Sequence, residues 1–231
     1  LHAMVDCIAQ PLKGKGVLVA NCEIYNWKEL AEKKKLKAKN DADLLLKLFD
    51  KEGVSEKTLD QLEGVYAFAY LKNNSLTLAR DMLGVKPMWY SATSGFSFAS
   101  EKKVLKKWQE DFIDELHPRT LLTYNLETKK ISTIERSFFE LTTNKNAEKQ
   151  LPKLLEESVV KRFPDEPFGI LFSGGVDSTL IAQIAKKHKK QFTCFVTGVE
   201  DPNWKQSEDV IWAKKAAKQH GFKLKEVILS Q

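Results

Sequence analysis

Hydrophobic and polar positions in the first half of the chain alternate as they do in antiparallel strands. Residues 16–24 (GVLVANCEI) alternate and are rich in β-formers, and residues 40–49 (NDADLLLKLF) indicate a helix capped by Asn40. Short apolar runs separated by turn signals follow, which is typical of an antiparallel meander. The expected strands are residues 65–70, 75–80, 88–91, 96–100, 121–124 and 130–133. This half is therefore predicted to be α+β.

The pattern changes after the polar stretch 142–149 (TTNKNAEK), where helices begin to alternate with apolar strands. Strands joined by helices of this length predict parallel pairing through crossover connections. The expected helices are residues 151–163, 178–189 and 207–220, and the expected strands are residues 168–172, 192–197 and 223–229. We therefore expect two domains, residues 1–143 and residues 144–231, the second with an α/β parallel sheet.

Composition narrows the class of protein. The chain has 231 residues, 42% of them hydrophobic and 29% charged, with a net charge of +6. The lysines are mixed with acidic residues, which favours a solvated surface over a nucleic-acid footprint. No apolar run approaches the roughly 18 residues that would indicate a membrane span. The cysteines, Cys7, Cys22 and Cys194, are too widely spaced for a zinc or redox pair, so we expect a cytoplasmic protein.

A glycine turn at residues 171–178 (LFSGGVDS) joins an expected strand to an expected helix. Gly174 and Gly175 allow backbone N–H groups to approach phosphate oxygens, and the helix N-terminus adds partial positive charge. Ser173 and Ser178 can add hydroxyl donors, while Asp177 suggests a magnesium ion beside the phosphates. The alternative is a tight turn in which Asp177 and Ser178 only cap the helix.

The full string SGGVDS resembles the signature of the N-type ATP pyrophosphatases, which activate a carboxylate or carbonyl as an adenylate. It is not a Walker loop, because no lysine and hydroxyl pair follows the glycines. The resemblance implies that ATP is bound with magnesium at Asp177, and that Leu171, Thr197 and Gly198 contact adenosine. A plain glycine at the end of a strand is the competing interpretation of Gly198.

Residues 21–26 (NCEIYN) look like the NGEIYN segment of class II glutamine amidotransferase domains, in the form fused to asparagine synthetases. Further matching segments follow in the order of that family. They are residues 10–12, 62–69, 80–87 and 98–102. The resemblance implies an N-terminal nucleophile-type glutaminase domain of antiparallel sheets with helices, followed by the ATP pyrophosphatase domain.

An amidotransferase must hold glutamine and stabilise the oxyanion that forms when a thiolate attacks its side-chain amide. The resemblance implies that Asn21 and the backbone N–H of Cys22 form this oxyanion hole. It also implies that Met4, Glu23 and Asp41 bind glutamine. Alternatively, Asp41 is a carboxylate that complements the dipole at a helix start.

The sequence departs from the family at two points. Cys22 stands where the family has glycine, which would strain the backbone if that position needs a positive φ. The family's nucleophile is an N-terminal cysteine whose own α-amine acts as base, whereas residue 1 here is leucine. Because residues 1–5 resemble the stretch after the family's glutamine-binding arginine, we expect a chain truncated at both ends, with that cysteine before Leu1.

Taken with the resemblance, these features predict a ligase that makes asparagine from aspartate, ATP and glutamine-derived ammonia. The reaction would pass through a β-aspartyl adenylate and release AMP and pyrophosphate. One alternative is a related amide- or β-lactam-forming synthetase, and another is a nucleotide-binding relative without glutaminase activity. We expect small-molecule partners only, neither nucleic acid nor a membrane, and a homodimer is compatible with the sequence.

Overall fold

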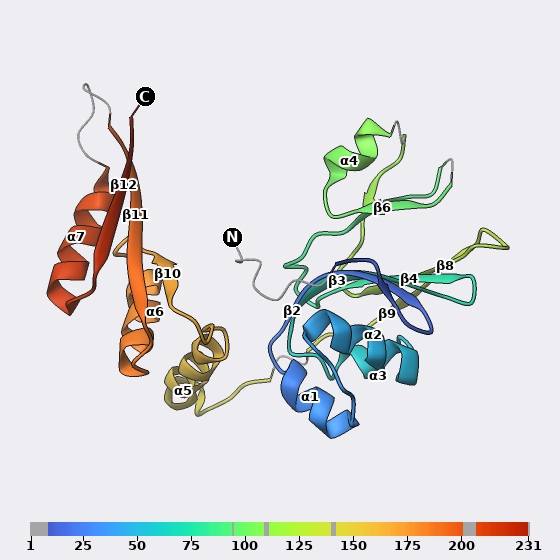
Figure 1. Cartoon of the computed structure of the whole chain (residues 1–231), viewed down its shortest axis with the longest axis horizontal. Helices are drawn as coiled ribbons and strands as arrows, with labels where there is room; N and C mark the ends of the chain where they lie inside the picture. The colour runs from blue at the N-terminus through green and yellow to red at the C-terminus, as the bar shows by residue number, and fades with distance from the viewer. Residues whose placement is uncertain (1–8, 94, 109–110, 140–141, 201–206, 231) are drawn as a thin grey trace. The chain divides into compact units, whose positions relative to one another are not determined.

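The computed structural model describes residues 9–93, 95–108, 111–139, 142–200 and 207–230. The chain forms two compact units, Leu1–Leu141 (unit 1) and Thr142–Gln231 (unit 2). The units divide after residue 141, close to the boundary after residue 143 that the sequence predicts. The assignment of the two predicted domains remains a prediction. Figure 1 labels the elements of each unit.

Unit 1 is built on a six-stranded antiparallel sheet in the order β1-β2-β3-β4-β8-β9. Its strands are β1 Leu12–Lys13, β2 Val17–Ile24, β3 Gly64–Lys72, β4 Ser75–Arg80, β8 Thr120–Asn125 and β9 Ile131–Glu135. A second sheet has the order β6-β5-β7, made of β5 Trp89–Ser91, β6 Ser97–Ala99 and β7 Asp114–Glu115. The meander expected for residues 65–100 is therefore interrupted after β4, because β5 and β6 pair in the small sheet and not with β4. After β4 the chain builds the small sheet and then returns as β8 beside β4, because the apolar second face of the large sheet needs a cover.

Helices cover the other face of the large sheet (Figure 1). They are α1 Trp27–Lys34, α2 Asp41–Glu52 and α3 Glu56–Leu59, whereas α4 Lys102–Lys107 packs against the small sheet. The predicted cap of α2 is confirmed, since the Asn40 side chain accepts a hydrogen bond from the Asp43 N–H at 2.9 Å. The fully buried Phe49 of α2 packs with Leu18 and Phe68 of the sheet.

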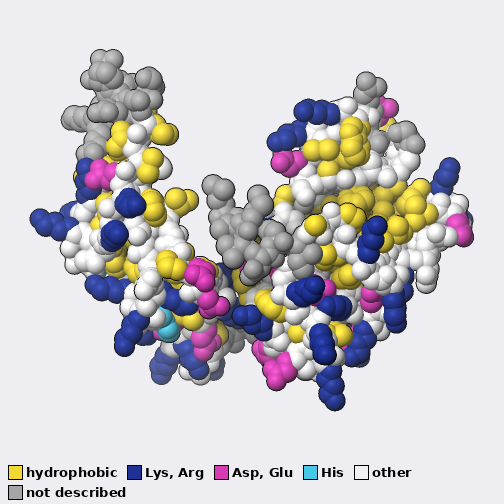
Figure 2. Space-filling view, in the orientation of Figure 1, with side chains coloured by type: hydrophobic (Ala, Val, Ile, Leu, Met, Phe, Trp, Pro, Cys, Tyr) yellow, Lys and Arg dark blue, Asp and Glu magenta, His cyan; other side chains and the backbone are white. Residues whose placement is uncertain are grey.

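Strand β2 shows how the alternation sorts side chains between the two faces. Leu18 and Ile24 belong to the core beneath the helices, and Cys22 packs against it. Val19 packs against the second core, between the two sheets, where Figure 2 shows hydrophobic side chains gathered. Since successive side chains of a strand point to opposite faces, Asn21 and Glu23 share the small-sheet face with Val19.

Unit 2 has the predicted parallel sheet, in the order β10-β11-β12. Its strands are β10 Phe168–Leu171, β11 Phe192–Glu200 and β12 Leu224–Ser230, and its helices are α5 Ala147–Val160, α6 Val176–Lys187 and α7 Glu208–His220. Side chains of α6 and α7 share one core with β10 and β11. Helix α5 begins four residues before its predicted start at residue 151. The N–H of Asn146, the residue before the helix, donates to Asn144 Oδ1 at 2.9 Å. Within the described ranges, no helix has both the length and the apolarity needed to cross a membrane.

Candidate functional site

Side chains close the outer edge of β2 at two positions, and no described residue pairs with the edge between them. The Ala20 N–H donates to Gln10 Oε1 at 2.7 Å, and Gln10 Nε2 donates to the Ala20 carbonyl at 2.8 Å. The Ile24 N–H donates to Asp41 Oδ2 at 3.1 Å. Because backbone groups alternate between the two edges of a strand, the Cys22 N–H points to this same edge, between the two clamps. It is therefore placed to donate to a bound molecule.

Asn21 lies beside this amide but on the small-sheet face. It lines a pocket of about 240 Å³ between the two sheets, together with Val19, Met88, Phe98 and Ser100. Its side chain is exposed, and the half-buried Glu23 lies on the same face of β2. The structure thus brings Asn21, the Cys22 N–H and Glu23 to one end of one strand. Met4 lies outside the described residues.

The Cys22 thiol lies on the opposite face of β2, within hydrogen-bonding reach of Asp41. Cys22 pairs with Tyr66 in regular strand geometry and is not among the described residues with positive φ, so the strain considered for this position does not arise. Burial, followed by the charge of Asp41 and the hydrogen bond to it, raises the pKa of the Cys22 thiol well above its usual value. The thiol therefore stays protonated at neutral pH, which makes it a weak nucleophile.

Asp41 has more partners than a simple helix-start carboxylate. Its Oδ1 accepts from the Ala42 N–H at 2.8 Å, as that alternative requires, while its Oδ2 reaches across to Ile24 of β2. The side chain therefore connects the start of α2 to the open edge. Glu23 lies on the other face of the strand, so the two acids approach the edge from opposite sides.

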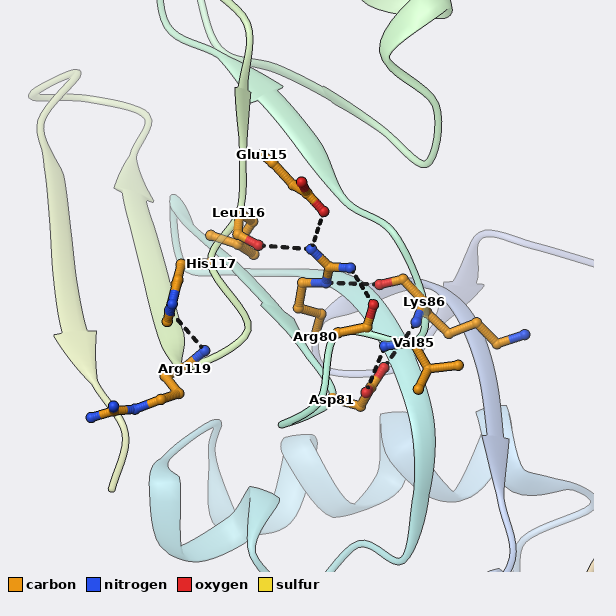
Figure 3. Close-up of polar contacts among 9 residues, drawn as sticks. Arg80, Asp81, Val85, Lys86, Glu115, Leu116, His117 and Arg119 are labelled. Carbon is orange, nitrogen blue, oxygen red and sulfur yellow. Dashed lines mark hydrogen bonds and ion pairs between the residues drawn. The ribbon is translucent and has the colours of Figure 1, made fainter. Parts of the chain in front are cut away.

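The loop after β4 is held by two buried charged residues, shown in Figure 3. Arg80 donates to the Lys86 carbonyl at 2.8 Å, to the Gly84 carbonyl at 2.6 Å and to Glu115 at 2.7 Å. Asp81 accepts from the N–H groups of Val85 at 2.9 Å and Lys86 at 3.0 Å. The loop is therefore fixed at both ends, and the Lys86 charge is close enough to act on Cys22.

In unit 2 the loop at 172–175 leads from β10 into α6, which begins at Val176 and not at Ser178 as predicted. The first bond within the helix joins the Thr179 N–H to the Gly175 carbonyl at 3.0 Å. The N–H groups of residues 176–178 therefore point out of the helix end, and no side chain caps them. Ser173 Oγ and Ser178 Oγ lie 3.3 Å apart at this end. Backbone and hydroxyl donors thus converge where a phosphate would bind.

Gly174 is required by its geometry in this loop. Its φ is +76°, and a Cβ there would lie 2.5 Å from the backbone carbonyl of Trp212 in α7. Gly175, the helix cap, has a φ of −71° and would bring a Cβ no closer than 3.3 Å to Ser173 Oγ. Only Gly174 is therefore needed for both its conformation and its close contact.

Asp177 is exposed in the first turn of α6. The described residues contain no group of three or more His, Cys, Asp or Glu side chains that could hold a metal ion. Magnesium, however, usually takes only one or two protein carboxylates and completes its shell with water and substrate phosphates. A single carboxylate beside the phosphate-binding donors fits this requirement.

The three residues expected to contact adenosine are not all on one face of the sheet. Leu171 pairs with Phe195, so its exposed side chain shares a face with that of Thr197. Gly198 faces α7, where a Cβ would lie 2.9 Å from Val210 Cγ2. The predicted strand end at Thr197 is wrong, because β11 continues beside β12 to Glu200. Close packing against α7 explains the glycine without a ligand.

Two contacts near the candidate glutamine site have no signal in the sequence. The resemblance includes Gln10 only within residues 10–12, and it does not include Arg136. Both act on residues distant in sequence, Gln10 on Ala20 and Arg136 on Tyr66. No local pattern indicates either contact.

Comparison with known proteins identifies both halves of the chain. Residues 2–153 match the glutamine amidotransferase domain family, and residues 150–231 match the asparagine synthase family. In fold, the chain resembles the solved structure of an allosteric regulatory enzyme of purine biosynthesis, with a TM-score of 0.50 and 16% identity over 96% of this chain and 56% of that one. The predicted fold class is confirmed.

The names of curated relatives refer both to asparagine synthesis and to glutamine hydrolysis. A Methanocaldococcus jannaschii protein provisionally named asparagine synthetase [glutamine-hydrolyzing] 1 is 36% identical, over 93% of this chain and 42% of its own length. The asparagine synthetase [glutamine-hydrolyzing] of Mus musculus is 30% identical, over 92% of this chain and 44% of its own length. The chain thus spans less than half the length of these relatives. It belongs to the glutamine amidotransferase domain family, in the form followed by an asparagine synthase segment.

Proposed function

We propose that the protein containing this chain is a glutamine-hydrolysing asparagine synthetase. The observation that supports this proposal is the presence, in one chain, of the Cys22 backbone amide beside Asn21, to which no described residue bonds, and of converging backbone and hydroxyl donors at residues 173–178. The first supplies donors for an amide-cleaving site. The second supplies donors for nucleotide phosphates. Together they support a reaction in which nitrogen released at one site is consumed at another.

In the glutaminase step, attack of a thiolate on the side-chain amide of glutamine places negative charge on the amide oxygen. Asn21 and the Cys22 N–H would donate to that oxygen, and such donors are most effective when they are fixed in advance. Glu23, Asp41 and Met4 would hold the glutamine, the two carboxylates through its α-amino group. The attacking thiolate is not supplied by Cys22 or Cys194, because burial raises the pKa of both thiols, that of Cys194 to about 11.

In the synthetase step, a β-carboxylate oxygen of aspartate would attack the α-phosphorus of ATP. The bond to the β-phosphate oxygen breaks, pyrophosphate leaves, and ammonia then displaces AMP from the acyl carbon. Ser173, Gly174, Gly175 and Ser178 would hold the pyrophosphate, and residues 171, 197 and 198 the adenosine. Magnesium bound with Asp177 would share the charge of the phosphates.

The test is an assay of the complete gene product with glutamine, ATP and a series of carboxylates. We expect glutamate, AMP, pyrophosphate and asparagine in equal amounts when aspartate is present. Amide or β-lactam formation from another carboxylate, with aspartate inert, would instead identify a related synthetase. Absence of AMP and pyrophosphate with every carboxylate would contradict the proposal. We expect the enzyme in the cytoplasm, and light scattering distinguishes a monomer from a homodimer.

One observation favours a second candidate, a nucleotide-binding relative without glutaminase activity. The Cys22 thiol lies within hydrogen-bonding reach of Asp41, so it competes for the carboxylate expected to bind the glutamine amino group. In that case the complete protein would use ammonium but not glutamine. Cys22→Gly would then restore glutamate release if the thiol is the cause.

A further inference from the structure

Arg136 is a buried cation at the point where the chain leaves the large sheet. Only 1% of its surface is exposed, and it follows directly after β9. Its N–H donates to the Arg119 carbonyl at 2.7 Å, and Arg119 Nε donates to the Arg136 carbonyl at 3.0 Å. The next residue, Ser137, donates its N–H to Glu56 at 2.6 Å. The backbone at this point is therefore fixed to unit 1.

The Arg136 guanidinium has partners that do not neutralise it. One terminal nitrogen donates to the Tyr66 hydroxyl at 3.0 Å, and the other lies 3.5 Å from Met82 Sδ. Among the described residues, Nε has no hydrogen-bond partner, and Asp60 and Asp81, whose charges act on the Tyr66 hydroxyl, form no ion pair with the guanidinium. Burying a charge without an ion pair opposes folding, and an apolar side chain of the same size would often be more stable. A purely structural role therefore explains Arg136 poorly.

Both partners of Arg136 adjoin the candidate glutamine site. Tyr66 lies directly opposite Cys22 in the pairing of β2 with β3. The backbone of Tyr66 makes two hydrogen bonds with Asp81. The Tyr66 carbonyl accepts from the Asp81 N–H at 2.7 Å, and the Tyr66 N–H donates to Asp81 Oδ2 at 3.3 Å. Met82 begins the loop that Asp81 holds through its following N–H groups. Arg136 thus contacts the strand behind Cys22 and the loop beside it at once.

We propose that Arg136 is a positioning residue for glutamine hydrolysis. The inference rests on the proposed function of the Asn21–Cys22 segment and adds a residue to it. Arg136 does not contact the outer edge of β2, but it holds Tyr66, which pairs with Cys22 across the inner edge of β2, and Met82 in the loop after β4. A displacement of about 1 Å in a catalytic donor can lower turnover by about a hundredfold, so a fixed support for the Cys22 N–H matters for rate.

The test uses the full-length protein with Arg136→Met, which removes the charge and keeps an unbranched side chain. We expect kcat for glutamine-dependent synthesis to fall at least tenfold, ammonia-dependent synthesis to stay within twofold, and the unfolding midpoint to stay equal or rise. Arg136→Lys, which keeps a donor, should recover part of the loss. Arg162→Met, the same change in an exposed arginine of unit 2, should leave the ratio of the two activities unchanged. An equal fall in both activities, or no fall in either, would overturn the proposal.

Two further measurements separate this inference from the proposed function. Tyr66→Phe should produce the same selective loss, and the double variant with Arg136→Met should lose no more than either single variant. Full additivity would mean that Arg136 does not act through Tyr66. The Asp81 N–H donates to the Tyr66 carbonyl, so its amide hydrogen exchange should be faster in Arg136→Met than in the wild type. If the wild type releases no glutamate, the proposed function fails, and unchanged exchange at Asp81 would separately refute the positioning role.

Discussion

Replacing Gly174 with alanine should destabilise unit 2 far more than the same change one residue later. The φ of +76° at Gly174 costs an alanine about 1–2 kcal/mol. Its Cβ would also lie 2.5 Å from the carbonyl carbon and oxygen of Trp212 and 2.7 Å from the Ala213 nitrogen. These atoms belong to the backbone of α7 and cannot rotate away, so overpacking adds about 1–3 kcal/mol. Local adjustment of the loop should relieve part of this overpacking, so we expect a total loss of about 2–4 kcal/mol.

The matched control is Gly175→Ala. Its φ of −71° suits alanine, and the nearest atom to a Cβ is Ser173 Oγ at 3.3 Å. The expected loss is about 1 kcal/mol or less, from the poorer helix cap. Amide hydrogen exchange in α6 and α7 is the suitable measurement, because it reports the opening of unit 2 independently of unit 1. Protection should fall about 30- to 1,000-fold in Gly174→Ala and less than about tenfold in Gly175→Ala. Equal losses in the two variants would refute the reasoning.

The remaining predictions concern two carboxylates. Asp177→Ala should abolish pyrophosphate release and leave the circular dichroism spectrum unchanged, because the Asp177 side chain is exposed and does not pack in the hydrophobic core. Turnover like that of the wild type would refute the proposed magnesium-binding role of Asp177. Burial raises the pKa of Asp50, but hydrogen bonds from the Tyr70 hydroxyl at 2.7 Å and from the N–H groups of Lys15 and Gly16 outweigh burial and lower it. The stability that Asp50 contributes is therefore fully present above the unfolded pKa of about 3.9 and lost as pH falls through the lower folded value. Asp50→Asn should therefore destabilise unit 1 by about 1–3 kcal/mol at pH 7 and progressively less below pH 4. Urea titrations of both proteins at several pH values measure this, and a difference in unfolding free energy that stays constant with pH would contradict it.

Local patterns predicted those parts of the fold that local forces determine. The alternation in residues 16–24 placed a strand that the structure has at Val17–Ile24, and Asn40 caps α2 as expected. The parallel order of unit 2 followed from its helical crossovers. The separation of β5, β6 and β7 into their own sheet could not be predicted, because it depends on how Met88 and Leu116 cover Leu78 and Leu122 across the chain.

The candidate site residues could likewise be predicted only where they are close in sequence. The glycines and serines of the candidate loop at residues 173–178 lie within six consecutive residues, so the sequence alone indicated their chemistry. Whether Cys22 would strain the backbone depended on φ at that position, which follows from the pairing with Tyr66 and not from the local sequence. The burial of Arg136 was equally invisible, since Tyr66 lies 70 residues away.

The two side-chain clamps on β2 also bear on self-association. A strand from another molecule can add to a sheet edge only where successive N–H and C=O groups are free to pair. Gln10 occupies both groups of Ala20, and Asp41 occupies the N–H of Ile24. As far as the described residues go, a neighbouring chain would find the Cys22 position alone between these obstacles. The edge can therefore present one donor to a small molecule and still resist the edge-to-edge pairing that leads to aggregation.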